Sequence, residues 1–187
     1  MTAAADDYAT MIDSLRLFLD RVAGARPTAE ESAELAATLD GLSAGLADRQ
    51  VRERDRLFAR LPVQGRAQSL TPQFFIDEQD DQSVRGHVTF RPYFVGGNGA
   101  AHGGTIPLLF DEALGRLANA GGRRASRTAY LHVNFRSIAR IGNRLTLTAR
   151  FVKEEGRKRL ISGELFDGDV LVADAEGLFI ELRPGQP

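Results

Sequence analysis

The chain has 187 residues, of which 43% are hydrophobic, which is ordinary for a globular protein and sufficient for one domain with a sizeable core. Its 24 basic and 25 acidic residues give a formal net charge of −1, so bulk charge favours neither a nucleic acid nor a membrane surface as a partner. It contains no cysteine, which excludes disulfides, thiolate catalysis and cysteine-ligated zinc.

The amino-terminal residues, MTAAADDY, lack the basic-then-apolar layout of a signal peptide. No apolar run reaches the length that a membrane span requires. We therefore expect a cytoplasmic protein without membrane insertion.

Residues 5–60 carry the spacing of helices. Apolar side chains recur three or four positions apart in two stripes, and Gly24 and Pro27 interrupt the pattern between them. Thr28 and Glu31 have the spacing of a capping box, which predicts the start of a second helix. The stripes consist of Ile12, Leu15, Leu19 and Val22, followed by Leu35, Leu39, Leu42 and Leu46.

The charge-rich stretch 48–60, DRQVRERDRLFAR, is expected to continue the second helix with a solvated face. Two prolines and a glycine between residues 62 and 72 then indicate a linker. We therefore predict a helical extension at residues 1–65 and a second unit at residues 66–187.

The second unit has the pattern of strands around one helix. Short β-rich runs occupy residues 74–76, 84–90 and 93–95. A helix is predicted from about Gly104 to Ala120, with Gly121 and Gly122 as its stop. Its expected core residues are Ile106, Leu109, Phe110, Ala113, Leu114 and Leu117. Three or four strands follow, at about 127–137, 143–154, 158–166 and 170–182, which indicates an α+β fold.

The stretch Phe94–Gly115, FVGGNGAAHGGTIPLLFDEALG, carries the features that point to chemistry. Glycines before a helix leave backbone N–H groups at its positive end, which can hold an anion or a developing oxyanion. Asp111 lies among apolar residues of the same helix, so we expect it to be at least partly buried, and Glu112 to be exposed. Spacing alone supports a functional Asp111 and an ordinary helix carboxylate equally.

Asp111 follows Gly104 by seven residues, so the two lie on nearly the same helix face but about 10 Å apart along the axis. One carbonyl must lie about 3 Å from both its oxyanion donor and the attacking group. A single helix cannot easily provide both. Two antiparallel copies can, which predicts a dimer with shared sites if the pair is catalytic.

Several weaker motifs do not fit their usual contexts. The segment Gly41–Gly45 matches G-x-S-x-G, but it lies in a leucine-striped helix rather than after a strand. The segment 97–102 lacks the third glycine of a dinucleotide loop. His87, His102 and His132 show no metal-ligand spacing, so we expect no metal site. His87 and His132 are expected on strand surfaces or at interfaces, whereas His102 could cap the glycine loop or orient a substrate carbonyl.

Three segments together resemble the hotdog-fold acyl-CoA thioesterases of the phenylacetic-acid-degradation (PaaI-like) group. The first is His102-Gly103-Gly104 with an acid nine residues after the histidine. The second is TAYLHVNFRSIARIGNRLTLTARF, which is similar to T-x-x-L-x-V-N-F-x-R-P…G-x-L, and the third is GRKRLISGELFDGDVLVADAEGLFI. The resemblance covers about residues 73–182, and residues 1–60 lie outside it.

This resemblance implies an antiparallel sheet wrapped around one long helix, dimers formed by sheet extension, and often tetramers. It implies hydrolysis of an acyl-CoA thioester without a metal or a cofactor other than the CoA of the substrate. Asp111 then matches the general base or nucleophile, and Gly104, with Gly103, matches the backbone donor to the carbonyl. His102 matches the motif histidine, and Thr128 matches the residue that helps to place the attacking water.

The chain departs from the family pattern at two places. Gly96 stands where the family often has asparagine, and Asn98 is the nearest substitute. Ser137 stands where the family has the proline that follows Arg136. Basic residues are expected near the CoA phosphates, and the candidates are Arg123, Arg124, Arg127, Arg157, Lys158 and Arg159.

Two other functions remain open on the same fold. One is a non-catalytic acyl-CoA-binding or interaction module, which does not need Asp111. The other is a hydratase or dehydratase, although the chain has no D-x-x-x-x-H or H-F-P-G motif.

Overall fold

The computed structural model describes residues 3–186, apart from the side chains of residues 3, 4, 64 and 66. The chain divides into two compact units, Met1–Gln68 and Ser69–Pro187. Within the described residues, no helix is both long enough and apolar enough to cross a membrane.

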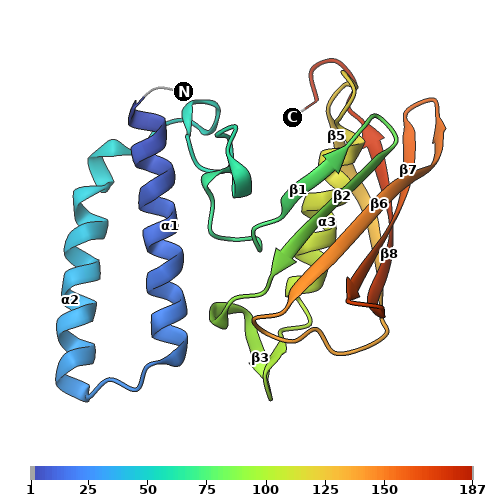
Figure 1. Cartoon of the computed structure of the whole chain (residues 1–187). Helices are drawn as coiled ribbons and strands as arrows, with labels where there is room; N and C mark the ends of the chain where they lie inside the picture. The colour runs from blue at the N-terminus through green and yellow to red at the C-terminus, as the bar shows by residue number, and fades with distance from the viewer. Residues whose placement is uncertain (1–2, 187) are drawn as a thin grey trace. The chain divides into compact units, whose positions relative to one another are not determined.

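The first unit contains two helices, α1 (Ala3–Gly24) and α2 (Ala29–Gly45), which are labelled in Figure 1. The capping box at the start of α2 is confirmed, since Glu31 N–H donates to Thr28 Oγ1 at 3.2 Å and Thr28 N–H donates to Glu31 Oε2 at 2.7 Å. The G-x-S-x-G segment lies inside α2, as expected.

The prediction that residues 48–60 continue the helix is wrong. This stretch forms two short 3-10 turns, Ala47–Arg49 and Glu53–Asp55, joined by extended residues. The ion pair between Arg52 and Asp55 spans three positions and closes one such turn at 2.9 Å. The stretch has no apolar stripe to hold a longer helix against a core.

Residues 61–68 are packed rather than forming a free linker. A third 3-10 turn, Gln64–Ala67, brings Leu61 and Ala67 into a small core with Ile12 of α1. Because this core excludes α2, no residue of α2 is buried, and Leu35, Leu39, Leu42 and Leu46 are 41–64% exposed.

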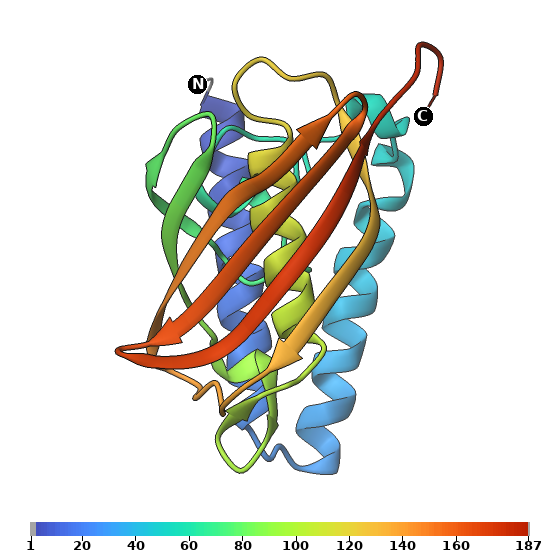
Figure 2. The same ribbon diagram turned by 90° about the vertical axis from the view of Figure 1, so that its right-hand side faces the viewer.

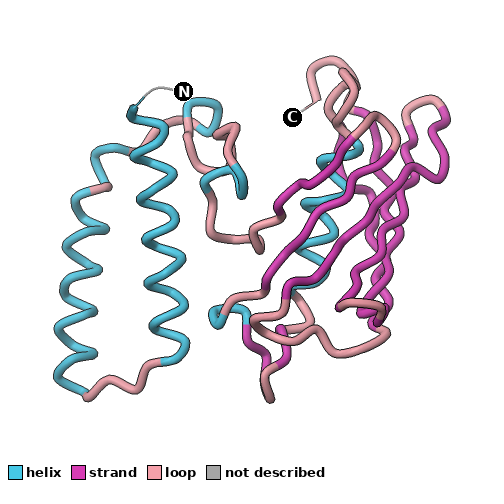
Figure 3. The backbone as a smooth tube through the Cα atoms, in the orientation of Figure 1, coloured by secondary structure: helices cyan, strands magenta, loops and turns pink. Residues whose placement is uncertain are grey.

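The second unit is a six-stranded antiparallel sheet in the order β1-β2-β6-β7-β8-β5 with one long helix, α3 (Thr105–Ala118). The α+β prediction is therefore confirmed, and Figure 3 shows strands grouped around one helix in this unit. The strands are β1 (Phe75–Gln79), β2 (Ser83–Thr89), β5 (Ser126–Phe135), β6 (Arg144–Glu155), β7 (Lys158–Asp167) and β8 (Val170–Glu181). A small hairpin, β3 (Val95–Gly97) and β4 (Ala100–Ala101), precedes α3. Of residues 93–95, predicted as strand, Val95 begins β3, whereas Tyr93 and Phe94 belong to a 3-10 turn, Pro92–Phe94.

The core lies between α3 and the sheet that covers it (Figure 2). All six core residues predicted for α3 are buried, and Leu109, Phe110 and Leu114 have no exposed surface. Alternating side chains of the strands, such as Leu145 and Leu147 of β6, fill the other side of the core. Gly163 of β7 permits the close approach of the helix, because a Cβ there would lie 3.1 Å from both Phe110 and Leu114.

Gly86 of β2 is the position where an added methyl group meets most resistance. A Cβ at Gly86 would lie 2.2 Å from the Phe75 backbone oxygen and 2.6 Å from the Phe74 ring. We expect Gly86→Ala to lower the free energy of unfolding by about 2 kcal/mol or more, because the contact is with backbone that cannot move alone. Gly115→Ala is the matched control, since its Cβ would make an ordinary 3.5 Å contact with Phe179. Chemical denaturation followed by circular dichroism measures both, and equal stability of the two variants would contradict the prediction.

Candidate active site

Asp111 lies on the side of α3 that the sheet leaves open. It is about 120° around the helix from the centre of the buried stripe, and its side chain is exposed. The expectation of partial burial is therefore wrong for the single chain, because apolar neighbours in sequence point away from Asp111 around the helix. Glu112, expected to be exposed, has a side chain only 17% exposed and lies 3.7 Å from the Arg116 guanidinium.

Thr128 is the side chain that contacts Asp111. Its Oγ1 hydroxyl donates to Asp111 Oδ1 at 2.7 Å. Thr128 lies on β5, which runs alongside α3, so the contact joins the edge of the sheet to the central helix. The structure thus brings together two of the residues that the sequence selected.

The glycine loop is organised by His102. Its backbone N–H donates to the Phe94 carbonyl at 2.7 Å, which fixes the loop beside the β3–β4 hairpin. The Gly104 N–H donates to His102 Nδ1 at 3.0 Å, and the Thr105 N–H donates to the His102 carbonyl at 2.9 Å. Of the two roles considered for His102, capping the loop is the one that these contacts fit. The Gly104 N–H is therefore already paired within the chain.

Lack of space explains why position 96 is a glycine. A Cβ at Gly96 would lie 2.7 Å from the His102 Cα, so no side chain fits there without moving the loop. Asn98 adopts a left-handed conformation with φ of 50° in the exposed turn of the β3–β4 hairpin. Asparagine tolerates that conformation better than most residues, so turn formation accounts for Asn98.

The candidate phosphate ligands divide into engaged and exposed side chains. Arg123 pairs with Glu154 at 3.0 Å and lies 4.3 Å over the Phe151 ring, so it is part of the scaffold. Its guanidinium, by hydrogen bonding, holds the pKa of the Glu154 carboxyl below its usual range. Arg157 Nε donates to the Glu181 carbonyl at 2.9 Å. Arg159 is 2% exposed and donates to the backbone carbonyls of Ala118 and Arg124, so it is not available to a phosphate at the surface.

Three of the candidate basic side chains are exposed: Arg124, which pairs with Glu181 at 3.7 Å, Arg127 and Lys158. Arg127 of β5 and Lys158 of β7 both pair with Ile180 of the intervening strand β8. They therefore lie in one row across the sheet, about 10 Å apart, which is two strand spacings.

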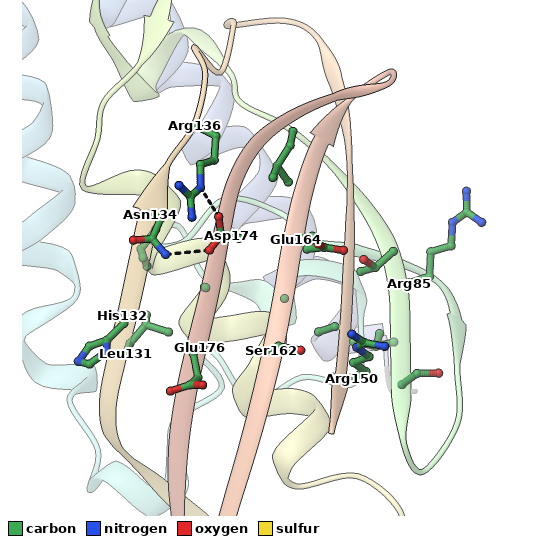
Figure 4. Close-up of a pocket in the computed structure, with 18 of the residues that line it drawn as sticks. Arg85, Leu131, His132, Asn134, Arg136, Arg150, Ser162, Glu164, Asp174 and Glu176 are labelled. Atoms are coloured by element: carbon green, nitrogen blue, oxygen red, sulfur yellow. Dashed lines mark hydrogen bonds and ion pairs between the residues drawn. The ribbon is translucent and has the colours of Figure 1, made fainter. Parts of the chain in front are cut away.

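A separate hollow of about 1400 Å³ lies on the face of the sheet that points away from α3 (Figure 4). It is lined by polar side chains, and Asp174 accepts hydrogen bonds there from Arg136 and Asn134. The Arg136 guanidinium, with help from Asn134, holds the pKa of the Asp174 carboxyl below its usual range. None of the site residues predicted from the sequence lines this hollow. His132 lies at its border beside Tyr130, and His87 contacts Asp77, so both are strand-surface histidines as expected.

Sequence reasoning missed Asn119, which follows the last residue of α3. Its side-chain oxygen accepts from both the backbone N–H and the hydroxyl of Ser126, the first residue of β5. An asparagine two residues before a pair of glycines is recognisable as a helix end, but no sequence signal connects it with Ser126.

Comparison with known proteins supports the fold of the second unit. Residues 98–173 match the model of the thioesterase superfamily. The chain is 32% identical to acyl-coenzyme A thioesterase THEM4 of Bos taurus over 142 residues, which cover 73% of this chain. It spans 58% of that relative's length, so much of the relative has no counterpart here.

Solved structures extend the similarity. The crystal structure of a thioesterase superfamily protein, RHA08564, has a TM-score of 0.79 at 27% identity and covers 93% of this chain and 90% of its own. Because of that coverage, the match includes residues of both units. The PaaI protein of E. coli, from the phenylacetic acid degradation operon, has a TM-score of 0.55 at 21% identity over 58% of this chain and 82% of its own. At this identity the similarity shows a shared fold alone. Residues 98–173 therefore form a domain of the thioesterase superfamily, and the sheet wrapped around α3 is the hotdog fold of that superfamily.

Proposed function

We propose that this protein hydrolyses an acyl-coenzyme A thioester to a free acid and coenzyme A. The observation that carries the proposal is the Asp111 carboxylate, held at 2.7 Å by the Thr128 hydroxyl on the exposed side of a helix whose opposite face is buried. The name of the curated relative, an acyl-coenzyme A thioesterase, supports the substrate class. The proposal needs no cofactor other than the coenzyme A of the substrate, and no metal.

Asp111 acts on the thioester carbonyl in one of two ways. As a general base, it takes a proton from water while the water oxygen bonds to the carbonyl carbon, and the C–S bond then breaks. As a nucleophile, it attacks that carbon itself, forming an anhydride that water cleaves. In both routes the thiolate of coenzyme A leaves and takes up a proton. The Thr128 hydroxyl orients the carboxylate in either route.

The Gly104 N–H polarises the carbonyl at the amino-terminal end of α3, where the helix dipole also favours negative charge. This donor is occupied by His102 Nδ1 in the ligand-free chain. Binding therefore requires the substrate oxygen to replace the imidazole nitrogen. The exchange has a low cost, because one hydrogen bond of this N–H replaces another. Gly103, which adjoins it in the exposed loop, provides room for the acyl group.

The site is shared between two copies of the chain. Asp111 and Gly104 lie about 10 Å apart along one helix, too far to act on one carbonyl. An antiparallel second helix brings the amino-terminal end of one copy to the exposed Asp111 of the other. Strand β5 ends the sheet order with a neighbour on one side only, so its free edge supports pairing with a second copy. A pair of such dimers would give the tetramer that the resemblance also allows.

Replacing Asp111 tests the catalytic role directly. We expect Asp111→Asn to reduce kcat by about 100-fold or more, because the amide has nearly the same shape but cannot act as base or nucleophile. Free-thiol release from a panel of acyl-CoAs measures the rate, and Glu112→Gln is the matched control on the adjacent carboxylate. Equal rates for Asp111→Asn and wild type would contradict the mechanism. Tight binding of acyl-CoA without any thiol release by wild type would instead favour the binding module.

The exposed basic row is expected to act on substrate binding. We expect Arg127→Gln and Lys158→Gln each to raise KM about fivefold at low ionic strength and to leave kcat unchanged, since they contact only the phosphates. Lys153→Gln is the control, because Lys153 is also exposed but pairs with Glu155 at 2.6 Å. A KM insensitive to both substitutions and to salt would place the phosphates elsewhere.

Mixed dimers test the shared site. Gly104→Pro removes the N–H donor while its φ of −67° suits proline. Co-expressed Asp111→Asn and Gly104→Pro chains would form mixed dimers, each with one intact site, and we expect about a quarter of wild-type activity from two nearly inactive parents. Sedimentation confirms that the sample is dimeric. A mixture as inactive as its parents, or an active monomer, would contradict a shared site.

A further inference from the structure

Two positions of α3 and the residue that caps its end form one stripe facing the start of β5. Asp111, Gly115 and the C-cap residue Asn119 are spaced by four residues, so they lie one above the other along the helix. The first contacts Thr128 and the last contacts Ser126, two residues earlier on β5. Gly115 between them has no side chain, and its carbonyl accepts from Asn119 Nδ2 at 2.7 Å. The same helix stripe thus contains the catalytic carboxylate and a second polar link to the strand.

The second link is a clasp of two hydrogen bonds. Asn119 Oδ1 accepts from the Ser126 backbone N–H at 2.8 Å and from its hydroxyl at 3.1 Å. Ser126 is buried, at 5% exposure. The bond from Asn119 to Gly115 holds the amide in the orientation that presents its oxygen to Ser126. All three bonds therefore depend on the single Asn119 side chain.

Within one chain, the sheet holds Thr128 from one side only, through the pairing of β5 with β8. The pairing of β5 with β8 shifts between Thr128 and Tyr130, which leaves a bulge directly after Thr128. Within one chain, β5 has no strand neighbour on its other edge. Thr128 therefore sits between a bulge on one side and the clasp at Ser126 on the other.

A separate contact holds the helix end itself. The buried Arg159 guanidinium donates to the Ala118 carbonyl at 2.9 Å and to the Arg124 carbonyl at 2.7 Å, and pairs with Glu181 at 3.0 Å. Loss of the Asn119 side chain would then release Ser126 from α3, while the pairing of Ser126 with β8 and the attachment of the end of α3 remain. The clasp is in this respect separable from the stability of the fold.

We propose that Asn119 is a positioning residue for catalysis: by holding Ser126 against α3, it places the Thr128 hydroxyl on Asp111. The inference rests on the proposed thioesterase function. Asn119 contacts neither the substrate nor the reacting atoms, and it acts on turnover only through Thr128.

A double-mutant cycle on kcat tests this role. We expect Asn119→Ala to lower kcat about tenfold with little change in KM, because a small displacement of a positioned group is costly in the reaction. Thr128→Val, which removes the hydroxyl at constant shape, should have a similar effect. In the Thr128→Val background, Asn119→Ala should cost less than about twofold, since the contact it serves is already gone. Asn119→Asp retains the oxygen that Ser126 requires, so its kcat should be closer to wild type.

The controls separate positioning from general destabilisation. Asn143→Ala removes another inter-strand amide contact, to Asp167 at 2.7 Å, and should leave kcat unchanged. Thermal unfolding of every variant shows whether the protein is folded at the assay temperature. An equal loss from Asn119→Ala in both backgrounds, or no loss in wild type, would overturn the inference. Because Asp111→Asn is measured alongside, an unaffected Asp111→Asn enzyme would identify failure of the proposed function rather than of the positioning role.

Discussion

The burial of one face of α3 against the sheet is the constraint on which the second unit depends. Leu109, Phe110 and Leu114 have no exposed surface, and Gly163 of β7 lets the helix approach the strands to van der Waals distance. Burial of such side chains contributes about 2 kcal/mol each, so rotation of the helix about its axis would be prohibitively costly. The orientation of α3 is therefore fixed, and with it the direction of every polar residue that the helix carries.

The position of Asp111 follows from that fixed orientation. With the apolar stripe against the sheet, Asp111 must lie at the side of the helix, where β5 passes and Thr128 can reach it. The helix end is secured in the same way, by Asn119 and the buried Arg159. The carboxylate is thus held by a rigid element and supported by side chains from a neighbouring strand. A reactive group requires such support to be placed accurately.

The sequence was sufficient for the fold where a single periodicity decided the outcome. The stripe of α3, the four long strands and the capping box at Thr28 were all predicted, because local spacing determines them. Residues 48–60 were mispredicted, since charge alternation resembles a helix face without providing a core to pack on. The exposure of Asp111 was also mispredicted, because sequence neighbours of a helical residue point in other directions. The clasp between Asn119 and Ser126 requires the chain to turn back on itself, which no local pattern describes.

The Asp111 carboxylate and the Gly104 N–H each form a hydrogen bond with a side chain of the same chain, but the two bonds differ in what they mean for catalysis. Thr128 donates to the Asp111 carboxylate, and this bond is compatible with catalysis because the second carboxylate oxygen remains available to water. His102 accepts from the Gly104 N–H, and this bond must break before a carbonyl can take its place. The donor at the start of α3 is therefore paired within the chain, and it becomes available only to an acceptor able to replace an imidazole nitrogen. A thioester oxygen that becomes an oxyanion is such an acceptor, and it gains strength during the reaction while the imidazole bond does not.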